Sequence, residues 1–86
     1  MTEKEHKSVL IVSSSDKIFD AISSSLPLSE FFPVEHAASA ALARRKLKEN
    51  EWDILFINSP LGDESGLDLA LHAAEDYYAG VLLLVK

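Results

Sequence analysis

Cysteine is absent from the sequence, which excludes disulfides, thiolate metal sites and a cysteine nucleophile. The absence fits a reducing compartment, so we expect a cytoplasmic protein. Long apolar runs are also missing: the longest covers residues 81–85, whereas a membrane-spanning helix needs about 20 apolar residues. No membrane association is therefore expected. Basic residues are few, with 8 against 14 acidic ones, and the net charge of −6 argues against general attraction to nucleic acid.

The 86 residues are enough for one small domain, and their 48% hydrophobic content is ordinary for globular proteins. Short apolar runs that favour buried strands alternate with segments of helical spacing, which begin at serine caps. Strands are expected at residues 8–12, 32–37, 53–57 and 81–85, and helices at 15–26, 39–50 and 65–78. Residues 1–7 are polar and are expected to form an N-terminal tail, so that the domain covers residues 8–86.

The element order βαβαβαβ, with strands apolar on both faces, predicts a parallel sheet covered by helices. The second strand carries Pro33 near its start and is therefore expected at an edge of the sheet. The last strand is the most hydrophobic and should have neighbours on both sides, yet only Lys86 follows it. We expect either that the natural chain continues beyond Lys86 or that this strand pairs with another molecule.

A polar residue stands where an α/β protein often carries its reactive group, because Asn58 follows the buried run 53–57. Earlier in the chain another apolar run is followed by Ser13 and Ser14, and Gly66 comes eight residues after Asn58. In order and spacing, these segments resemble the receiver domain of bacterial two-component response regulators. The resemblance implies an α/β, flavodoxin-like fold with strand order 2-1-3-4-5. This chain would then lack the last strand and the last two helices.

The resemblance matches Asn58 to the phosphoacceptor aspartate of receivers. It matches Ser13 and Ser14 to their acidic pair, and Lys86 to the threonine or serine after the fourth strand. Phosphoryl transfer to aspartate needs a carboxylate nucleophile and magnesium, which prefers anionic oxygen ligands. None of the matched acidic positions carries a charge, so we expect the magnesium site to be lost and no other cofactor to be used. The resemblance thus predicts a degenerate receiver, or pseudo-receiver, that is not an enzyme and acts through a protein partner or a second copy.

Two other functions fit the sequence. One is a receiver phosphorylated on a non-standard acceptor, such as Asp16, Asp53 or Asp63. Asp53 stands five residues before Asn58, which is about 16 Å along an extended strand. The other is a structural homodimer joined through the exposed last strand at residues 81–85.

The segments around Asn58 and Lys86 also look like receivers attached to ANTAR-type RNA-binding antiterminator modules. That likeness implies transcription regulation, with RNA bound only by a C-terminal output module beyond Lys86. Within the sequence itself no RNA-binding motif is recognisable.

Plainer explanations compete with several of these assignments. Asn58 is the kind of residue that hydrogen-bonds the turn after a strand. The three consecutive serines lack the glycines of a phosphate-cradling loop and fit helix capping better. The three histidines share no metal-ligand spacing, so no metal site is predicted. The aromatic residues considered as core or core rim are Phe31, Phe32, Trp52, Tyr77 and Tyr78.

Half of the basic residues lie within five positions, at Arg44, Arg45, Lys46 and Lys48. This cluster is a candidate docking patch for a partner. The solvated outer face of an amphipathic helix explains the same pattern.

Overall fold

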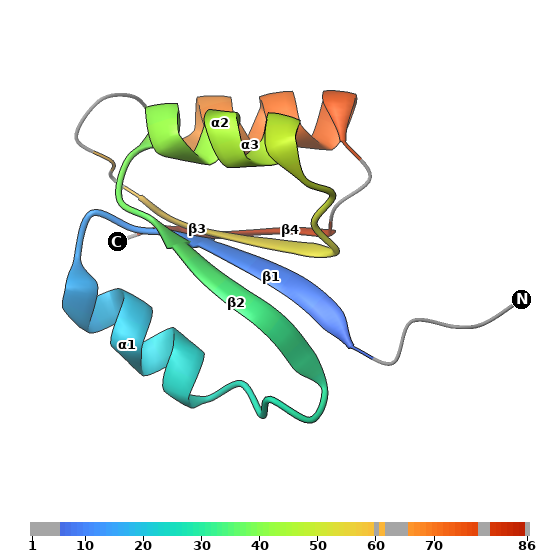
Figure 1. Ribbon diagram of the computed structural model, residues 1–86. Helices are drawn as coiled ribbons and strands as arrows, with labels where there is room; N and C mark the ends of the chain where they lie inside the picture. Colours follow the sequence, from blue (N-terminus) through green and yellow to red (C-terminus); the bar gives the residue numbers. More distant parts are fainter. Residues whose placement is uncertain (1–5, 60, 62–65, 78–79, 86) are drawn as a thin grey trace, which may run out of the picture.

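The computed structural model describes residues 6–59, 61, 66–77 and 80–85 of the chain. Strands and helices alternate along it, as the sequence predicts (Figure 1). The elements are β1 (Lys7–Val12), α1 (Asp16–Ser24), β2 (Phe31–Ala37), α2 (Ala40–Glu49), β3 (Ile54–Ser59), α3 (Gly66–Asp76) and β4 (Gly80–Val85). None of the described helices is long and apolar enough to span a membrane.

The four described strands form one parallel sheet in the order β2-β1-β3-β4. This order confirms the predicted flavodoxin-like class. The prediction of an edge position for the strand with Pro33 is also confirmed, because β2 pairs only with β1 in the described sheet. At the other edge, β4 pairs with β3 alone among the described strands.

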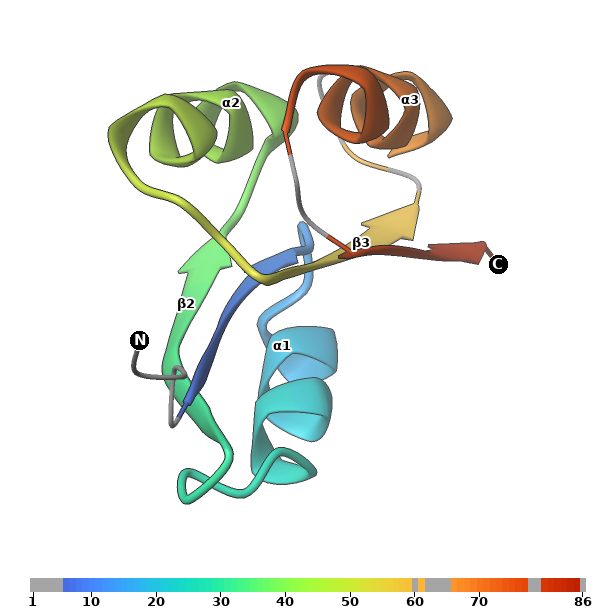
Figure 2. The same ribbon diagram turned by 90° about the vertical axis from the view of Figure 1, so that its right-hand side faces the viewer.

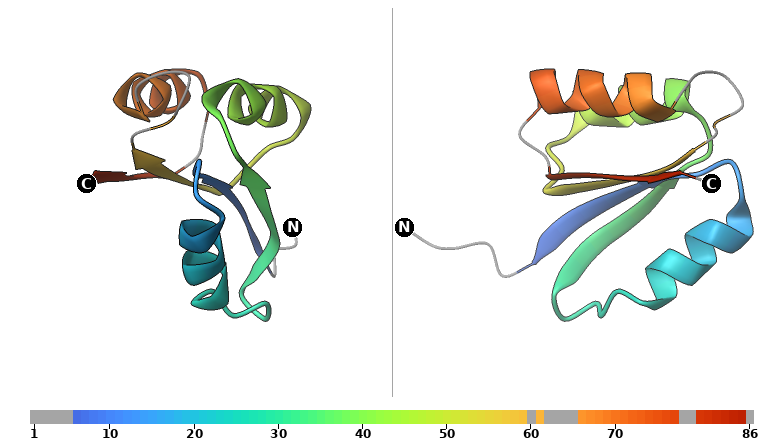
Figure 3. Two further views of the ribbon diagram at one scale, coloured as in Figure 1. Left: turned by 90° about the vertical axis from the view of Figure 1, so that its left-hand side faces the viewer. Right: turned by 180° about the vertical axis from the view of Figure 1, so that it is seen from behind.

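The helices cover the two faces of the sheet unequally. Figures 1 and 2 show α2 and α3 side by side over one face and α1 alone against the other. The view from behind in Figure 3 shows the same division. The β1 strand is the centre of this arrangement, since its residues from Val9 to Val12 have no exposed surface. A strand that is apolar on both faces is what a parallel sheet covered on both sides requires.

The face under α2 and α3 holds the main hydrophobic core. Alternate residues of the two central strands point into it, where small alanines let both helices approach closely. The completely buried members from the sheet are Leu10, Val12, Ala37, Leu55 and Ile57, and those from the helices are Ala40, Ala43, Leu69 and Ala73.

The α1 face is less complete. The α1 helix has no buried residue, although its apolar side chains are concentrated on one side. Next to it, Ile54 and Phe56 of β3 are only half-buried, and Leu82 of β4 is 49% exposed. No described helix lies over this part of the sheet (Figure 2). A strip of apolar surface along β3 and β4 therefore faces outward.

Serine caps begin the first two helices, as predicted. The Ser15 hydroxyl oxygen accepts the Ile18 N–H at 3.3 Å, and the Ser39 hydroxyl oxygen accepts the Leu42 N–H at 3.2 Å. The predicted cap of the third helix at Ser65 lies outside the described residues, and α3 begins at Gly66.

One of the aromatic assignments is wrong. Phe32 was expected in the core or at its rim, but its side chain is 59% exposed because it lies at the start of the edge strand, which has no neighbour beyond it in the described sheet. Trp52 is buried as expected, and its indole Nε1–H donates to the Lys46 carbonyl at 3.1 Å. Tyr77 packs against the main core, and Tyr78 lies outside the described residues.

Candidate functional site

The predicted site residues lie at the carboxyl ends of β1 and β3, which are neighbours in the sheet. Ser13 and Ser14 follow β1, whereas Asn58 is the last residue but one of β3, because this strand continues two residues beyond its expected end at residue 57. In the register of these strands Val12 lies opposite Ile57. The next residues, Ser13 and Asn58, therefore stand at the same level on strands that are about 5 Å apart. After this point the chain passes to α1 on one face and to α3 on the other (Figure 2). The ends of β1 and β3 thus form a topological switch point, where open α/β sheets bind their ligands.

Ser13 is fully buried, and its polar groups are used by the surrounding backbone. Its hydroxyl accepts the Ser15 N–H and donates to the Ser15 carbonyl, both at 3.0 Å. Its own N–H donates to the Ala37 carbonyl of β2 at 3.0 Å. The Ser13 side chain therefore shapes the turn into α1, and this favours the capping explanation of the serine run.

Ser14 and Asn58 are more accessible. Ser14 is exposed, whereas the Asn58 side chain is half-buried and its backbone pairs with Leu84 of β4. The residues that would complete the site, Lys86 and the alternative acceptor Asp63, lie outside the described residues. Within the described part of the chain, no three His, Asp or Glu residues converge as they would on a metal ion.

A histidine that sequence reasoning did not connect with the site lies against it. His36 reaches from β2, and its Nε2–H donates to the Ser13 carbonyl at 2.8 Å. Its ring stacks on Phe19 of α1, with centroids 4.4 Å apart and planes 9° from parallel. Its Nδ1 is 3.9 Å from an oxygen of Asp16. The signal available in the sequence was the place of His36, one residue before the end of a strand expected beside the first.

The alternative acceptors are in different places. Asp16 is the first residue of α1 and lies at the carboxyl ends of the strands, as Ser13 does. Its side chain is 94% exposed. Asp53 precedes β3, at the amino-terminal ends of the strands. Its Oδ2 accepts the Ser8 N–H at 2.8 Å and the Ser8 hydroxyl at 3.2 Å. Asp53 therefore links the beginnings of β1 and β3 by hydrogen bonds and lies at the opposite end of β3 from Asn58.

The candidate docking patch on α2 is partly engaged within the domain. The Lys46 ammonium donates to the Glu35 carboxylate of β2 at 2.8 Å, and Arg44 contacts the Nδ1 of His72 on α3. Arg45 is 74% exposed and lies 4.0 Å from Glu49 on its own helix. Three of the four basic residues are thus directed to different neighbours, and the fourth, Lys48, is exposed near the end of the helix.

No protein-family model and no curated protein matches this sequence. Solved structures do match. The mutant response regulator MaeR, bound to sulfate, has a TM-score of 0.86 and 17% identity, over 94% of this chain and 68% of that one. The signal receiver domain of an HD domain-containing protein from Pseudomonas fluorescens Pf-5 has a TM-score of 0.85 and 22% identity, over 96% and 61%.

A third match is the CheY-like response regulator receiver domain from Methylobacillus flagellatus, with a TM-score of 0.80, 20% identity, and coverage of 92% and 69%. This chain therefore has the fold of CheY-like receiver domains. It spans 61% to 69% of the length of these three chains.

Proposed function

We propose that this chain is a degenerate receiver domain of bacterial two-component signalling, which acts by protein contact without aspartyl phosphorylation. The observation that carries the proposal is the set of neutral side chains at the switch point of a receiver fold. Ser13 and Ser14 follow β1, and Asn58 lies near the end of β3. By the resemblance described above, receivers need an acidic pair and an acceptor at this end of the strands.

The chemistry of these groups supports the loss of phosphotransfer. An amide has no negative charge with which to attack phosphorus, so Asn58 cannot form an acyl phosphate. Magnesium retains affinity for a protein mainly through carboxylates. The Ser13 hydroxyl is moreover committed to the Ser15 backbone, so that metal binding there would require the turn to open.

A non-standard acceptor is the main alternative. Asp53 is a poor candidate because its carboxylate accepts hydrogen bonds from Ser8 at the amino-terminal ends of the strands, opposite to the candidate site. Asp16 lies at the carboxyl ends of the strands, on the same side as the candidate site, and the nearby His36 could orient its carboxylate. Among the described residues, however, Asp16 belongs to no group of three or more His, Asp or Glu side chains that could hold a metal ion.

A contact function needs a partner, and we propose a protein partner for the receiver-like surface. The likeness to ANTAR-type regulators extends the proposal to transcription regulation, in which a C-terminal output module would bind RNA. Phosphorylation would then be replaced as the input by binding of the partner.

The second candidate function is homodimerisation through β4. It is favoured by the strip of apolar surface on the β3 and β4 side, where Leu82 is 49% exposed on a strand that has one neighbour in the described sheet. Sizing of the chain over a dilution series tests this function. Dissociation accompanied by loss of the circular dichroism signal would support an obligate dimer.

The decisive experiment for the main proposal is incubation with acetyl phosphate and magnesium, followed by intact mass measurement. We expect no added phosphoryl group on the natural sequence. A variant with Ser13→Asp, Ser14→Asp and Asn58→Asp is the matched positive control, and it should gain magnesium affinity and a phosphoryl group if the fold is otherwise competent.

A phosphoryl group on the natural sequence would contradict the proposal. Repeating the reaction on the Asp16→Asn variant would then tell whether Asp16 is the acceptor. Circular dichroism of each variant checks that the added carboxylates leave the domain folded.

A further inference from the structure

The outer side of the helix layer formed by α2 and α3 carries exposed apolar side chains. Figure 2 shows these two helices above the sheet, with no described element over them. Six large apolar side chains are exposed in the described part of the chain, and three of them lie on these helices: Leu42, Leu67 and Leu71 are 42%, 52% and 54% exposed. We call the following exposed residues the α2–α3 surface: Leu42, Arg45, Lys48, Leu67, Leu71 and Glu75.

The two helices carry opposite charges. The α2 helix, Ala40–Glu49, has four basic side chains and one acidic one. The α3 helix, Gly66–Asp76, has three acidic side chains and neither lysine nor arginine. On the α2–α3 surface, Arg45 and Lys48 represent the positive helix and Glu75 the negative one. This surface is therefore positive along one helix and negative along the other.

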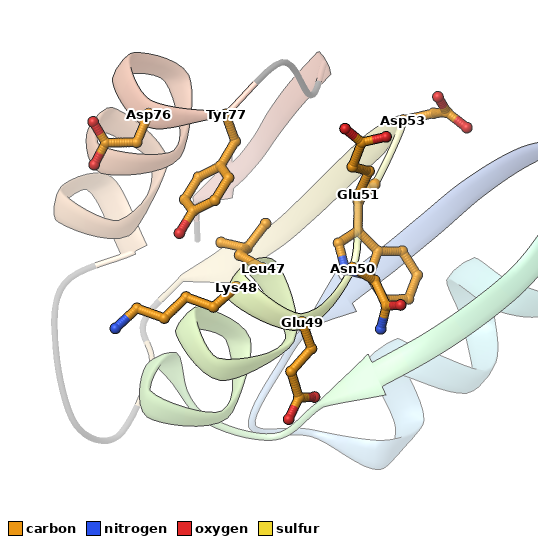
Figure 4. A pocket seen from close by; sticks show the side chains of 9 residues that line it. Leu47, Lys48, Glu49, Asn50, Glu51, Asp53, Asp76 and Tyr77 are labelled. Atoms are coloured by element: carbon orange, nitrogen blue, oxygen red, sulfur yellow. The ribbon is translucent and has the colours of Figure 1, made fainter.

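Two pairs of residues show how the helices are aligned along their length. The α2 helix connects β2 to β3 and α3 connects β3 to β4, so both helices run in the same direction beside a parallel sheet. Arg44 of α2 contacts the Nδ1 of His72 on α3, 28 positions later in the chain. Lys48 and Asp76, which have the same separation, line one cavity where the two helices end (Figure 4). A residue of α2 is thus level with the residue of α3 that follows it by about 28 positions.

This alignment brings complementary groups of the α2–α3 surface to the same height along the helix axes. Leu42 is one residue away from the level of Leu71, which corresponds to about 1.5 Å of helix. Glu75 lies between the levels of Arg45 and Lys48. An apolar group of one helix is therefore level with an apolar group of the other, and two basic groups are level with an acidic one.

We propose that the α2–α3 surface binds a second copy of this chain about a twofold axis that runs between α2 and α3 and parallel to them. Rotation about such an axis places α2 of each copy over α3 of the other, without a shift along the helices. Leu42 then meets Leu71 of the second copy, and Arg45 and Lys48 approach its Glu75. The leucines supply apolar contact, and the charges select the orientation.

The charges also exclude the other twofold arrangement of these helices. An axis across the helices would place α2 over α2 and α3 over α3, so that like charges would meet. Arg45 also lies 4.0 Å from Glu49 on its own helix. That pair does not compete strongly with Glu75 of the second copy, because an exposed ion pair within a helix is weak in water.

The test measures self-association by sedimentation velocity over a dilution series. We expect the natural sequence to form a dimer. Arg45→Glu and Glu75→Arg should each weaken the dimer about tenfold, because both copies of the contact then bring like charges together. An equimolar mixture of the two variants should form a dimer with the affinity of the natural sequence, since each new charge meets its opposite on the other copy. Recovery in the mixture also shows that both variants are folded.

Matched controls separate the contact from the net charge. Lys17→Glu and Glu30→Arg change the net charge by the same amounts at exposed positions outside the α2–α3 surface. Both should dimerise as the natural sequence does. Leu71→Ser should weaken the dimer, whereas Leu28→Ser, at a leucine that is 66% exposed outside this surface, should not.

Three results would overturn the proposal. The natural sequence could stay monomeric at every concentration, the controls could weaken the dimer as much as the α2–α3 variants do, or the dimer could persist in both charge-reversed variants. The last result would place the contact on another surface, such as β4. This inference rests on the proposed contact function, for which it names the surface and the partner. A monomer would overturn this inference alone, whereas a phosphoryl group gained from acetyl phosphate would overturn the proposed function whatever the oligomeric state.

Discussion

The two faces of the sheet are built from the same strands but are closed to different degrees. On the side of α2 and α3, alternate strand residues and the helix alanines form a core with no exposed surface at its centre. On the side of α1, the helix contributes no buried residue and Leu82 is half exposed. The difference teaches that the stability of this domain is carried mainly by the α2 and α3 face. The α1 face, by contrast, has apolar surface left for a further contact.

The largest expected effect comes from two neighbours on β3 that point to opposite faces. Leu55 is completely buried under α2 and α3, whereas Phe56 is half-buried on the α1 side. Leu55→Ala should lower the free energy of unfolding by about 2–5 kcal/mol, because it leaves a cavity in a closed core. Phe56→Ala should cost about 1 kcal/mol despite the larger side chain, since that ring is only partly removed from water.

Urea denaturation of both variants measures the two changes in the free energy of unfolding. A larger loss for Phe56→Ala than for Leu55→Ala would mean that the α1 face is closed in solution. The comparison of faces would then have to be reversed.

Intermediate effects are expected at the two serine caps. Ser15 caps α1 and Ser39 caps α2, each through one hydrogen bond to a backbone N–H. Replacement of either by alanine should cost about 1 kcal/mol of helix stability. In α1 the cost should appear as local opening, because no buried residue ties that helix to the global unfolding event.

Amide hydrogen exchange distinguishes local from global opening. Ser15→Ala should accelerate exchange in α1 alone, whereas Ser39→Ala should lower protection throughout the sheet. Equal behaviour of the two variants would show that both helices belong to one cooperative unit.

The smallest effect is expected at Leu82, on the open part of the sheet. Leu82→Ser should change the free energy of unfolding by no more than about 0.5 kcal/mol, since a half-exposed side chain loses few contacts. The measurement should be repeated at two protein concentrations. A marked loss of stability that depends on concentration would indicate that a second copy covers this surface.

Part of the candidate site is predictable from the sequence pattern combined with the resemblance to receivers, and part of it is not. The pairing of Ser13 with Asn58 follows from two predicted strands whose carboxyl ends meet, once the strand order is that of the receiver fold. The hydrogen bonds of Ser13 to Ser15 and the arrival of His36 at the Ser13 carbonyl were not predictable in that way. They depend on the exact turn after β1 and on the register of β2.

The sequence by itself determined the order of the strands and helices, and their limits to within about two residues, because apolar periodicity and serine caps act over a few residues. Only the tertiary structure decided how individual polar groups are used. Lys46 forms an ion pair with Glu35, Arg44 contacts His72, and the Asp53 carboxylate accepts a hydrogen bond from Ser8. The cavity that is lined by the ends of α2 and α3 (Figure 4) likewise exists only once these helices lie side by side. The physical reason is that such contacts join residues distant in the chain, whose approach depends on how the whole sheet and its helices pack.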